Sequence, residues 1–358
     1  MKNDIKNAVK IGCIFVGNVL GAGFASGKEL AEFFCRYGKG GIIGFAVCSV
    51  LFGILCCKVL RICREKNIKN YNEFNYFLFG EKIGVVTEVF SMLLTAEIFA
   101  AMIAGGSAAI GYFSGEESFL WNIAIGGMIF AVLMFDLKGI ADINMLLCPI
   151  LIIGGVTTGL YLYGKIGNGA ALGEDIIKEK AWYEWLISAI IYVSYNGVTV
   201  IPVITGIGEI KRSARCERLC GIISCLIIFM IGIIMMMPLY KMYGNIAGMP
   251  LPLLEMSERE GNVIRYVYFF VFTASVFTTA VGNGFGIVEW LGEKVMIKKV
   301  YIKIIVCAAV IIMSKVGFSA MVERIYPLFG CVGVCEIAAV FINSKKFEKV
   351  VDKGHHLW

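Results

Sequence analysis

Residues 16–34 read Val16-Gly-Asn-Val-Leu-Gly-Ala-Gly-Phe-Ala-Ser-Gly-Lys-Glu-Leu-Ala-Glu-Phe-Phe34. Gly21, Gly23 and Gly27 stand near the middle of this largely apolar stretch. A glycine inside a helix costs about 1 kcal/mol relative to alanine, and the bilayer core offers no water to a broken backbone. Breaks persist in membranes where protein or a polar cavity supplies hydrogen-bond partners. The stretch therefore predicts an interrupted membrane helix, with close helix packing as the alternative role for its glycines.

The composition of the whole chain also points to a membrane. The 358 residues are 58% hydrophobic and 17% charged, with a mean hydropathy of +0.79. Soluble domains are nearer about 45–50% apolar and about 25% charged. This composition excludes a disordered chain, a collagen and a nucleic-acid-binding domain.

Hydrophobic runs long enough to cross a bilayer recur along the chain, because a span needs about 20 apolar residues. The first run continues into Lys28 and Glu29 without a cleavage context, so it is not a cleavable signal peptide. We predict an all-α polytopic membrane protein with ten spans at roughly residues 9–36, 41–61, 83–113, 120–136, 141–164, 183–209, 219–239, 263–292, 300–317 and 320–343.

The basic residues orient these spans. Most Lys and Arg residues fall on the side that holds both termini, including the run Lys211, Arg212, Arg215 and Arg218. Cytoplasmic loops carry such an excess, so we expect both termini in the cytoplasm of a multi-pass cell-membrane protein. The formal charge of +6 then needs no nucleic-acid partner. The two longest loops, at about 165–182 and 240–262, fall on the outer side.

The spans also divide into two halves of five. Span 6 contains Tyr192-Val-Ser-Tyr-Asn-Gly197, followed by Pro202, Gly206 and Gly208, which predicts a second broken helix. Five is odd, so the halves enter the membrane from opposite sides, as in the inverted repeats of secondary transporters. We predict a first repeat at 1–165, an external connecting loop at 166–181, a second repeat at 182–343 and a cytoplasmic tail at 344–358.

The motif at residues 16–34 resembles the first-helix signature of YkvI-like membrane proteins. The span count and the two predicted breaks resemble the LeuT fold of the amino acid–polyamine–organocation transporter superfamily. This resemblance implies a substrate site between broken helices 1 and 6. The residues that it places there are Gly21, Gly23, Phe24, Ala25, Ser26, Gly27, Lys28, Glu97, Ser194, Tyr195, Asn196 and Gly197.

Free amides at the first break favour an anion such as a substrate carboxylate, whereas carbonyls at the end of the inner half favour a cation. The resemblance places a sodium ion between the first break and hydroxyls of the eighth helix. The sodium ligands that it implies are Val19, Ala22, Thr278 and Thr279. Proton coupling, no coupling ion, or hydroxyls bonded to their own helix are the alternatives.

Glu97 lies near the middle of the third span. A carboxylate at that depth is costly and usually faces a cavity or a partner. Glu97 is thus a candidate for carrying a proton or for binding a substrate amine, and a structural pair with Lys28 is the alternative.

These observations favour a secondary transporter of a small organic solute, an amino acid or an amine, coupled to Na+ or H+. A non-transporting nutrient sensor on the same fold is the alternative. An enzyme is not expected, because the two His residues, His355 and His356, lie in the tail and no GxSxG or HExxH motif is present. We expect no cofactor, and the expected partners are a small-molecule substrate and the lipid bilayer.

Overall fold

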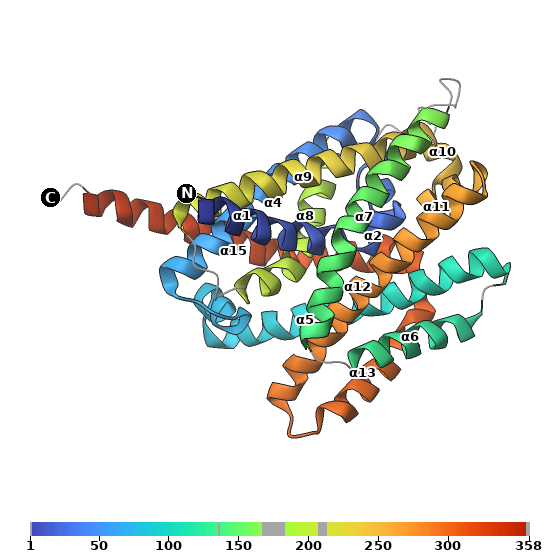
Figure 1. Cartoon of the computed structure of the whole chain (residues 1–358). Helices are drawn as coiled ribbons and strands as arrows, with labels where there is room; N and C mark the ends of the chain where they lie inside the picture. Colours follow the sequence, from blue (N-terminus) through green and yellow to red (C-terminus); the bar gives the residue numbers. More distant parts are fainter. Residues whose placement is uncertain (1, 117, 135–136, 167–182, 207–212, 356–358) are drawn as a thin grey trace.

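The computed structural model describes residues 2–116, 118–134, 137–166, 183–206 and 213–355. Every regular element in these ranges is helical (Figure 1). The helices of the first half are α1 (Lys2–Val19), α2 (Ala22–Ser26), α3 (Lys28–Phe33), the short η1 (Cys35–Tyr37), α4 (Lys39–Lys66), α5 (Tyr71–Ser114), α6 (Phe119–Leu133) and α7 (Leu137–Lys165). The predicted connecting loop at 166–181 lies almost wholly outside the described residues.

The second half begins with α8 (Glu184–Thr205) and α9 (Ala214–Lys241). Two short helices, α10 (Tyr243–Ile246) and α11 (Pro252–Arg259), fill the predicted loop at 240–262. The chain ends with α12 (Asn262–Lys294), α13 (Lys299–Met313), η3 (Ser314–Val316), α14 (Phe318–Ala320), the π-helical turn η4 (Met321–Ile325) and α15 (Tyr326–His355).

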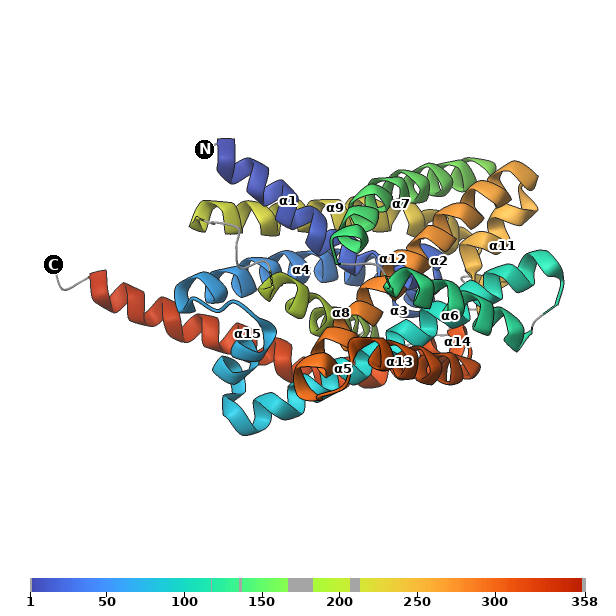
Figure 2. The same cartoon turned by 60° about the horizontal axis from the view of Figure 1, so that its bottom comes forward.

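Six of the described helical segments are long and apolar enough to cross a membrane. They are α4, α5, α8, α9, α12 and the segment Phe318–Asn343. The fourth predicted span coincides with the shorter apolar helix α6. The predicted all-helical polytopic architecture is confirmed, whereas the count of ten spans stays a prediction. The helix α1 begins and α15 ends on the same side of the molecule (Figures 1 and 2).

The helices pack in two groups. One group consists of α1, α4, α8 and α9, in which α9 packs against both α1 and α4. The other consists of α5, α6, α12 and α13, in which α12 packs against α5. Gly53 of α4 and Gly221 of α9 bring two backbones together, because a Cβ on either glycine would meet the carbonyl of the other. The helix α15 lies against α8 and also contacts α4 and α5.

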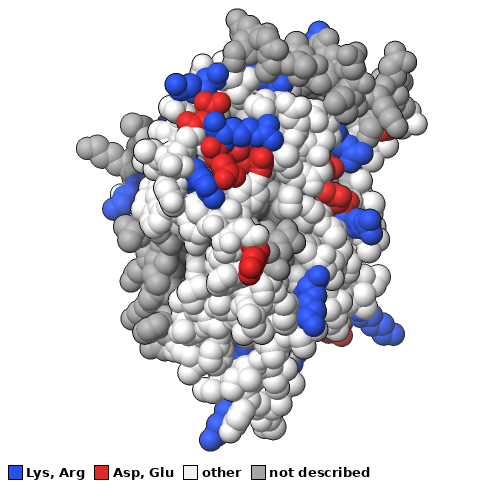
Figure 3. All heavy atoms as spheres, turned by 90° about the vertical axis from the view of Figure 1, so that its right-hand side faces the viewer, with Lys and Arg blue, Asp and Glu red and all other residues white. Residues whose placement is uncertain are grey.

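The end of the molecule away from the termini carries charges of both signs. Figure 3 shows Lys and Arg side chains next to Asp and Glu side chains in the upper part of this face. Ion pairs at this end include Arg265 with Glu258 at 2.9 Å and Arg259 with Glu255 at 3.1 Å. Charges of opposite sign therefore neutralise one another where α11 meets the start of α12.

The first predicted helix break is present, but the second is wrong as placed. The chain is non-helical at Leu20 and Gly21, between α1 and α2, and again at Gly27, whose φ is 80°. By contrast, α8 runs unbroken from Glu184 to Thr205, through residues 192–197. Gly208 lies outside the described residues.

Close packing explains the glycine in α8. A Cβ on Gly197 would collide with Ile337 of α15, and Gly333 of α15 in turn lies against the carbonyl of Ser194. Small residues let membrane helices approach in this way. Pro202 falls in the last turn of α8, where it removes one backbone bond near the helix end rather than in the middle.

Candidate functional site

The break between α1 and α2 leaves backbone groups without helical partners. The helical bonds stop with Leu20 N donating to Val16 O at 2.8 Å and resume with Ala25 N donating to Gly21 O at 2.9 Å. The carbonyls of residues 17–20 and the amides of residues 21–24 are thus left outside the helical pattern. Polar backbone at this depth needs other partners, so the break is a candidate binding region.

Side chains stabilise the segment from Gly23 to Lys28, which follows the break. Ser26 Oγ donates to Gly23 O at 2.7 Å and accepts from Lys28 N at 3.0 Å. The Tyr268 hydroxyl of α12 donates to Ala25 O. The amide of Lys28 is therefore already occupied, and α2 and α3 have only five and six residues. Both facts weaken the expectation that these amides hold a substrate carboxylate.

The carboxylate of Glu29 lies over Gly23. A Cβ on Gly23 would collide with the Glu29 side chain, so only glycine leaves room for the carboxylate there. Glu29 is 5% exposed, and its Oε2 accepts a hydrogen bond from the Tyr192 hydroxyl of α8 at 3.0 Å. The structure thus places an acidic side chain of the protein itself against α2, the short helix that follows the first break.

A row of aromatic side chains packs next to this carboxylate. The Tyr195 ring lies 5.3 Å from the Tyr192 ring and 4.9 Å from the Tyr326 ring, centroid to centroid. Phe33 of α3 packs against Tyr192 at 5.2 Å and against Tyr195 at 5.7 Å. The Tyr195 hydroxyl lies beside the Glu29 carboxylate but makes no hydrogen bond of acceptable geometry within the described residues. The three tyrosines and Phe33 form what we call the aromatic wall.

Glu97 of α5 is 3% exposed, and neither of its carboxylate oxygens has a hydrogen-bond partner among the described residues. The helix α5 packs against α8 and against α15, which begins at Tyr326. A buried carboxylate without partners is costly. Glu97 therefore remains a candidate site residue, since its buried carboxylate has no partner among the described residues.

Lys28 is not the partner of Glu97. Its side chain is buried, and its Nζ lies 2.6 Å from Oε1 of Glu323 in η4 and 3.4 Å from Oε1 of Glu32. The expected alternative, a structural Glu97–Lys28 pair, is thus replaced by an ion pair between α3 and the start of the last span.

Three of the four predicted sodium ligands lie at the first break, and the fourth, Thr278, is bonded to its own helix. Val19 and Ala22 flank the first break, and Gly21 lies against Thr279, with Oγ1 of Thr279 3.6 Å from the position of a Gly21 Cβ. Thr278 Oγ1 instead donates to Ser275 O at 2.9 Å, so it is bonded to its own helix. The Ser275 hydroxyl, one turn before Thr279, is buried and has no hydrogen-bond partner among the described residues.

The remaining predicted residues of α8 are bonded or packed within the helices. Ser194 Oγ donates to Ile190 O at 2.7 Å, and Asn196 Nδ2 donates to Tyr192 O at 3.1 Å. Gly197 lies against α15 rather than against the break. Of the residues predicted in α8, Tyr195 is the one that the structure brings to Glu29. Phe24 is buried at the break and lies 6.4 Å from Phe45 of α4, ring to ring.

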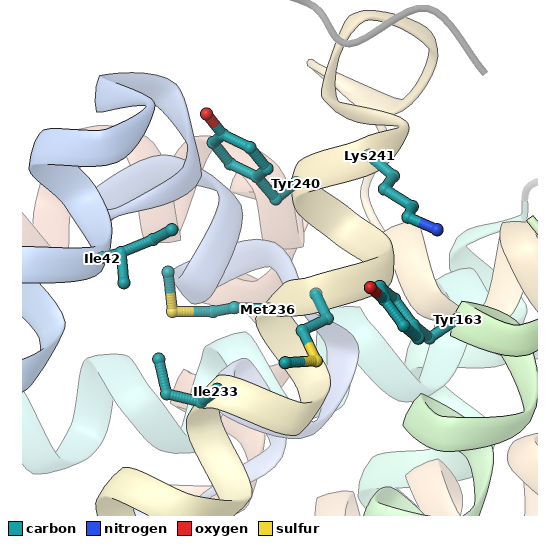
Figure 4. A pocket seen from close by; sticks show the side chains of 7 residues that line it. Ile42, Tyr163, Ile233, Met236, Tyr240 and Lys241 are labelled. Atoms are coloured by element: carbon teal, nitrogen blue, oxygen red, sulfur yellow. The ribbon is translucent and has the colours of Figure 1, made fainter. Parts of the chain in front are cut away.

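Two surface hollows lie elsewhere. One, of about 310 Å³, is lined by residues of α4, α7 and α9, where Lys241 sits 4.0 Å above the Tyr163 ring (Figure 4). The other, of about 270 Å³, lies between the end of α5 and residues 250–251. No lining residue of either hollow belongs to the first break. Within the described residues, no group of three or more His, Cys, Asp or Glu side chains could hold a metal ion.

Comparison with known proteins places the chain among membrane proteins. No protein-family model matches it. The uncharacterized membrane protein YkvI of Bacillus subtilis is 25% identical over 352 residues, covering 96% of this chain and 98% of YkvI. The uncharacterized protein YyaD of the same organism is 22% identical over 319 residues, covering 88% and 91%. The chain is a homologue of YkvI and a multi-pass membrane protein.

Solved structures identify the fold. MhsT in complex with L-phenylalanine matches with a TM-score of 0.63 at 14% identity, covering 93% of this chain and 87% of MhsT. The manganese transporter of Eremococcus coleocola, in complex with an aromatic bis-isothiourea substituted compound, matches with a TM-score of 0.63 at 13% identity, covering 93% and 77%. Both are transporters of the LeuT fold. The predicted resemblance to that fold and to YkvI is confirmed.

Proposed function

We propose that this protein is a secondary transporter of a small organic solute. The observation that carries the proposal is the interrupted first helix, whose unbonded backbone groups lie beside buried acidic and aromatic side chains in a transporter fold. A solute enclosed there would meet Gly21 to Lys28, Tyr195 and Glu97. The structure of MhsT with L-phenylalanine supports a small organic ligand.

The two packed groups of helices are the units that would move relative to each other during transport. We infer that α1, α4, α8 and α9 rock as one bundle against α5, α6, α12 and α13, exposing the site to each side of the membrane in turn. The proposed topology has ten spans in two inverted repeats, residues 1–165 and 182–343, with both termini in the cytoplasm. The shared side of the two ends of the chain supports an even number of spans.

For coupling we propose a sodium ion at the inner side of the break. Carbonyls of residues 17–20, together with the hydroxyls of Thr279 and Ser275, offer the oxygen ligands that a hard cation takes. The test is direct: ligand binding by the purified protein in sodium chloride should be tighter than in potassium chloride. Equal binding in the two salts would remove sodium from the proposal.

Transport itself is tested in liposomes. Purified protein in sealed vesicles should accumulate a radiolabelled solute that also raises the Tm of the detergent-solubilised protein. If a solute raises the Tm but does not cross the vesicle membrane, the result would contradict transport and favour a sensor.

A further inference from the structure

A carboxylate of the protein already lies against α2, the short helix that follows the first break. Glu29 lies over Gly23 and accepts from the Tyr192 hydroxyl at 3.0 Å. A substrate carboxylate in the same place would have to displace Glu29 and would be repelled by it. The position therefore suits a positive group better than a negative one.

A second carboxylate lies close by. Glu97 comes from α5, on the other group of helices, and both of its oxygens are buried without partners among the described residues. The helix α5 packs against α8 and α15, which supply the tyrosines of the aromatic wall, and against η4. A second buried acidic side chain thus comes from a helix that packs beside the aromatic wall.

No basic side chain of the described chain forms an ion pair with either carboxylate. The nearest candidate in the sequence, Lys28, lies 2.6 Å from Glu323, and Arg36 lies 3.4 Å from Glu32. Buried charges in proteins are normally paired. A bound cation or protons would neutralise the two carboxylates, for which the described residues offer no basic partner.

The aromatic wall favours an organic cation. The rings of Tyr192, Tyr195 and Tyr326 succeed one another at 5.3 and 4.9 Å, and Phe33 closes the row. The faces of aromatic rings attract ammonium groups, and the attraction strengthens where water is excluded. The Tyr195 hydroxyl also has no hydrogen-bond partner in the described chain, so it is free to accept from an ammonium N–H.

We propose that Glu29 and Glu97, walled by Tyr192, Tyr195 and Tyr326, form a site for an organic ammonium ion that lacks an α-carboxylate. This inference rests on the proposed transport function and narrows its substrate to amines. Glu29 holds the ammonium at the break, and Glu97 provides a second contact from α5. An α-amino acid with the same side chain would bring a third carboxylate into the region.

Matched pairs of ligands test the proposal on the unaltered protein. Each amine is compared with the amino acid that differs from it by one carboxylate: phenethylamine with L-phenylalanine, isoamylamine with L-leucine, putrescine with L-ornithine, and agmatine with L-arginine. Binding is measured by titration calorimetry and by the shift in Tm. In at least one pair the amine should bind ten times more tightly than its amino acid. Equal or tighter binding of the amino acids in every pair would overturn the proposal.

Variants locate the site. Glu29→Gln and Glu97→Gln should each weaken binding of the best amine at least tenfold, because each keeps the size of the side chain and removes its charge. The matched control is Glu289→Gln, since Glu289 pairs with Lys299 at the end of α12 and should leave binding unchanged. Undiminished amine binding in both variants would overturn the assignment, and the ligand pairs decide the matter even where a variant fails to fold.

Uptake into proteoliposomes distinguishes failure of the amine site from failure of the transport proposal. If amino acids are bound and carried while amines are not, the amine site is wrong and the transporter stands. If no member of any pair is bound or carried, the transporter proposal and the amine site both fail. Amine binding together with amine uptake supports both.

Discussion

The Nζ atom of Lys28, in α3, lies 2.6 Å from Oε1 of Glu323, in the π-helical turn η4 that precedes α15. The lysine side chain is 1% exposed and the glutamate side chain 35% exposed. The pair joins α3, the short helix after the first break, to the last predicted span. If the pair were broken, water could solvate the Glu323 carboxylate but not the buried Lys28 ammonium.

This difference predicts unequal costs for the two single substitutions. Glu323→Gln leaves a buried ammonium with only Glu32 at 3.4 Å, so it should lower the free energy of unfolding by about 1–3 kcal/mol. Lys28→Met removes the buried charge and leaves a carboxylate that water reaches, so it should cost less. The double variant should be more stable than Glu323→Gln alone. Tm in detergent gives the ranking, and the reverse order would contradict the pairing.

Glu97→Gln should separate activity from stability. The amide replaces a buried carboxylate that has no partner in the described chain, so Tm should stay within about 2 °C or rise. Uptake into proteoliposomes should fall at least tenfold. Glu116→Gln, at an exposed glutamate between α5 and α6, is the control. Normal uptake by the Glu97 variant would leave Glu97 as a structural residue only.

The two neighbouring threonines of α12 should behave differently. Thr279→Ala removes a hydroxyl that lies against Gly21 in the break. The sodium concentration that gives half of the maximal increase in Tm should therefore rise at least fivefold. Thr278→Ala removes a hydroxyl that is bonded to Ser275 O, so it should change the sodium requirement little. Comparable effects of the two substitutions would argue against a sodium ligand at Thr279.

Gly197→Ala tests the unbroken helix α8. An added methyl group would collide with the end of the Ile337 side chain, so the free energy of unfolding should fall by about 1–3 kcal/mol. The decrease is measured as a lower Tm. A second substitution, Ile337→Ala, should recover part of the loss by making room. A neutral Gly197→Ala would contradict this cost and show that the end of the Ile337 side chain moves aside for the methyl group.

The first break could be predicted from sequence because three glycines and a serine within the seven residues 21–27 are poorly suited to a continuous helix. Glu97 could be found for a similarly local reason, as a charge in the middle of an apolar run. Both signals are present within a few residues of the feature that they predict.

The role of the α8 glycine could not be predicted in the same way. A glycine in a membrane helix either breaks the helix or admits a neighbour, and the choice at Gly197 depends on Ile337, 140 positions later in the printed sequence. The aromatic wall is equally non-local, because Tyr192, Tyr195 and Tyr326 meet only after α8 and α15 pack. The role of Glu29 depends on its position over Gly23, which requires the backbone to turn at Gly27.

The π-helical turn at Met321–Ile325 also affects how this region tolerates changes in length. A π turn contains one residue more than an α turn. Elsewhere in the last span, deleting one residue would rotate every later side chain by about 100° and present the wrong face to α8. Between residues 321 and 325 the same deletion would convert the turn to an α-helix and leave the packing face of α15 in register. Relatives that lack one residue here should therefore keep the fold while changing the direction in which the position of Glu323 points.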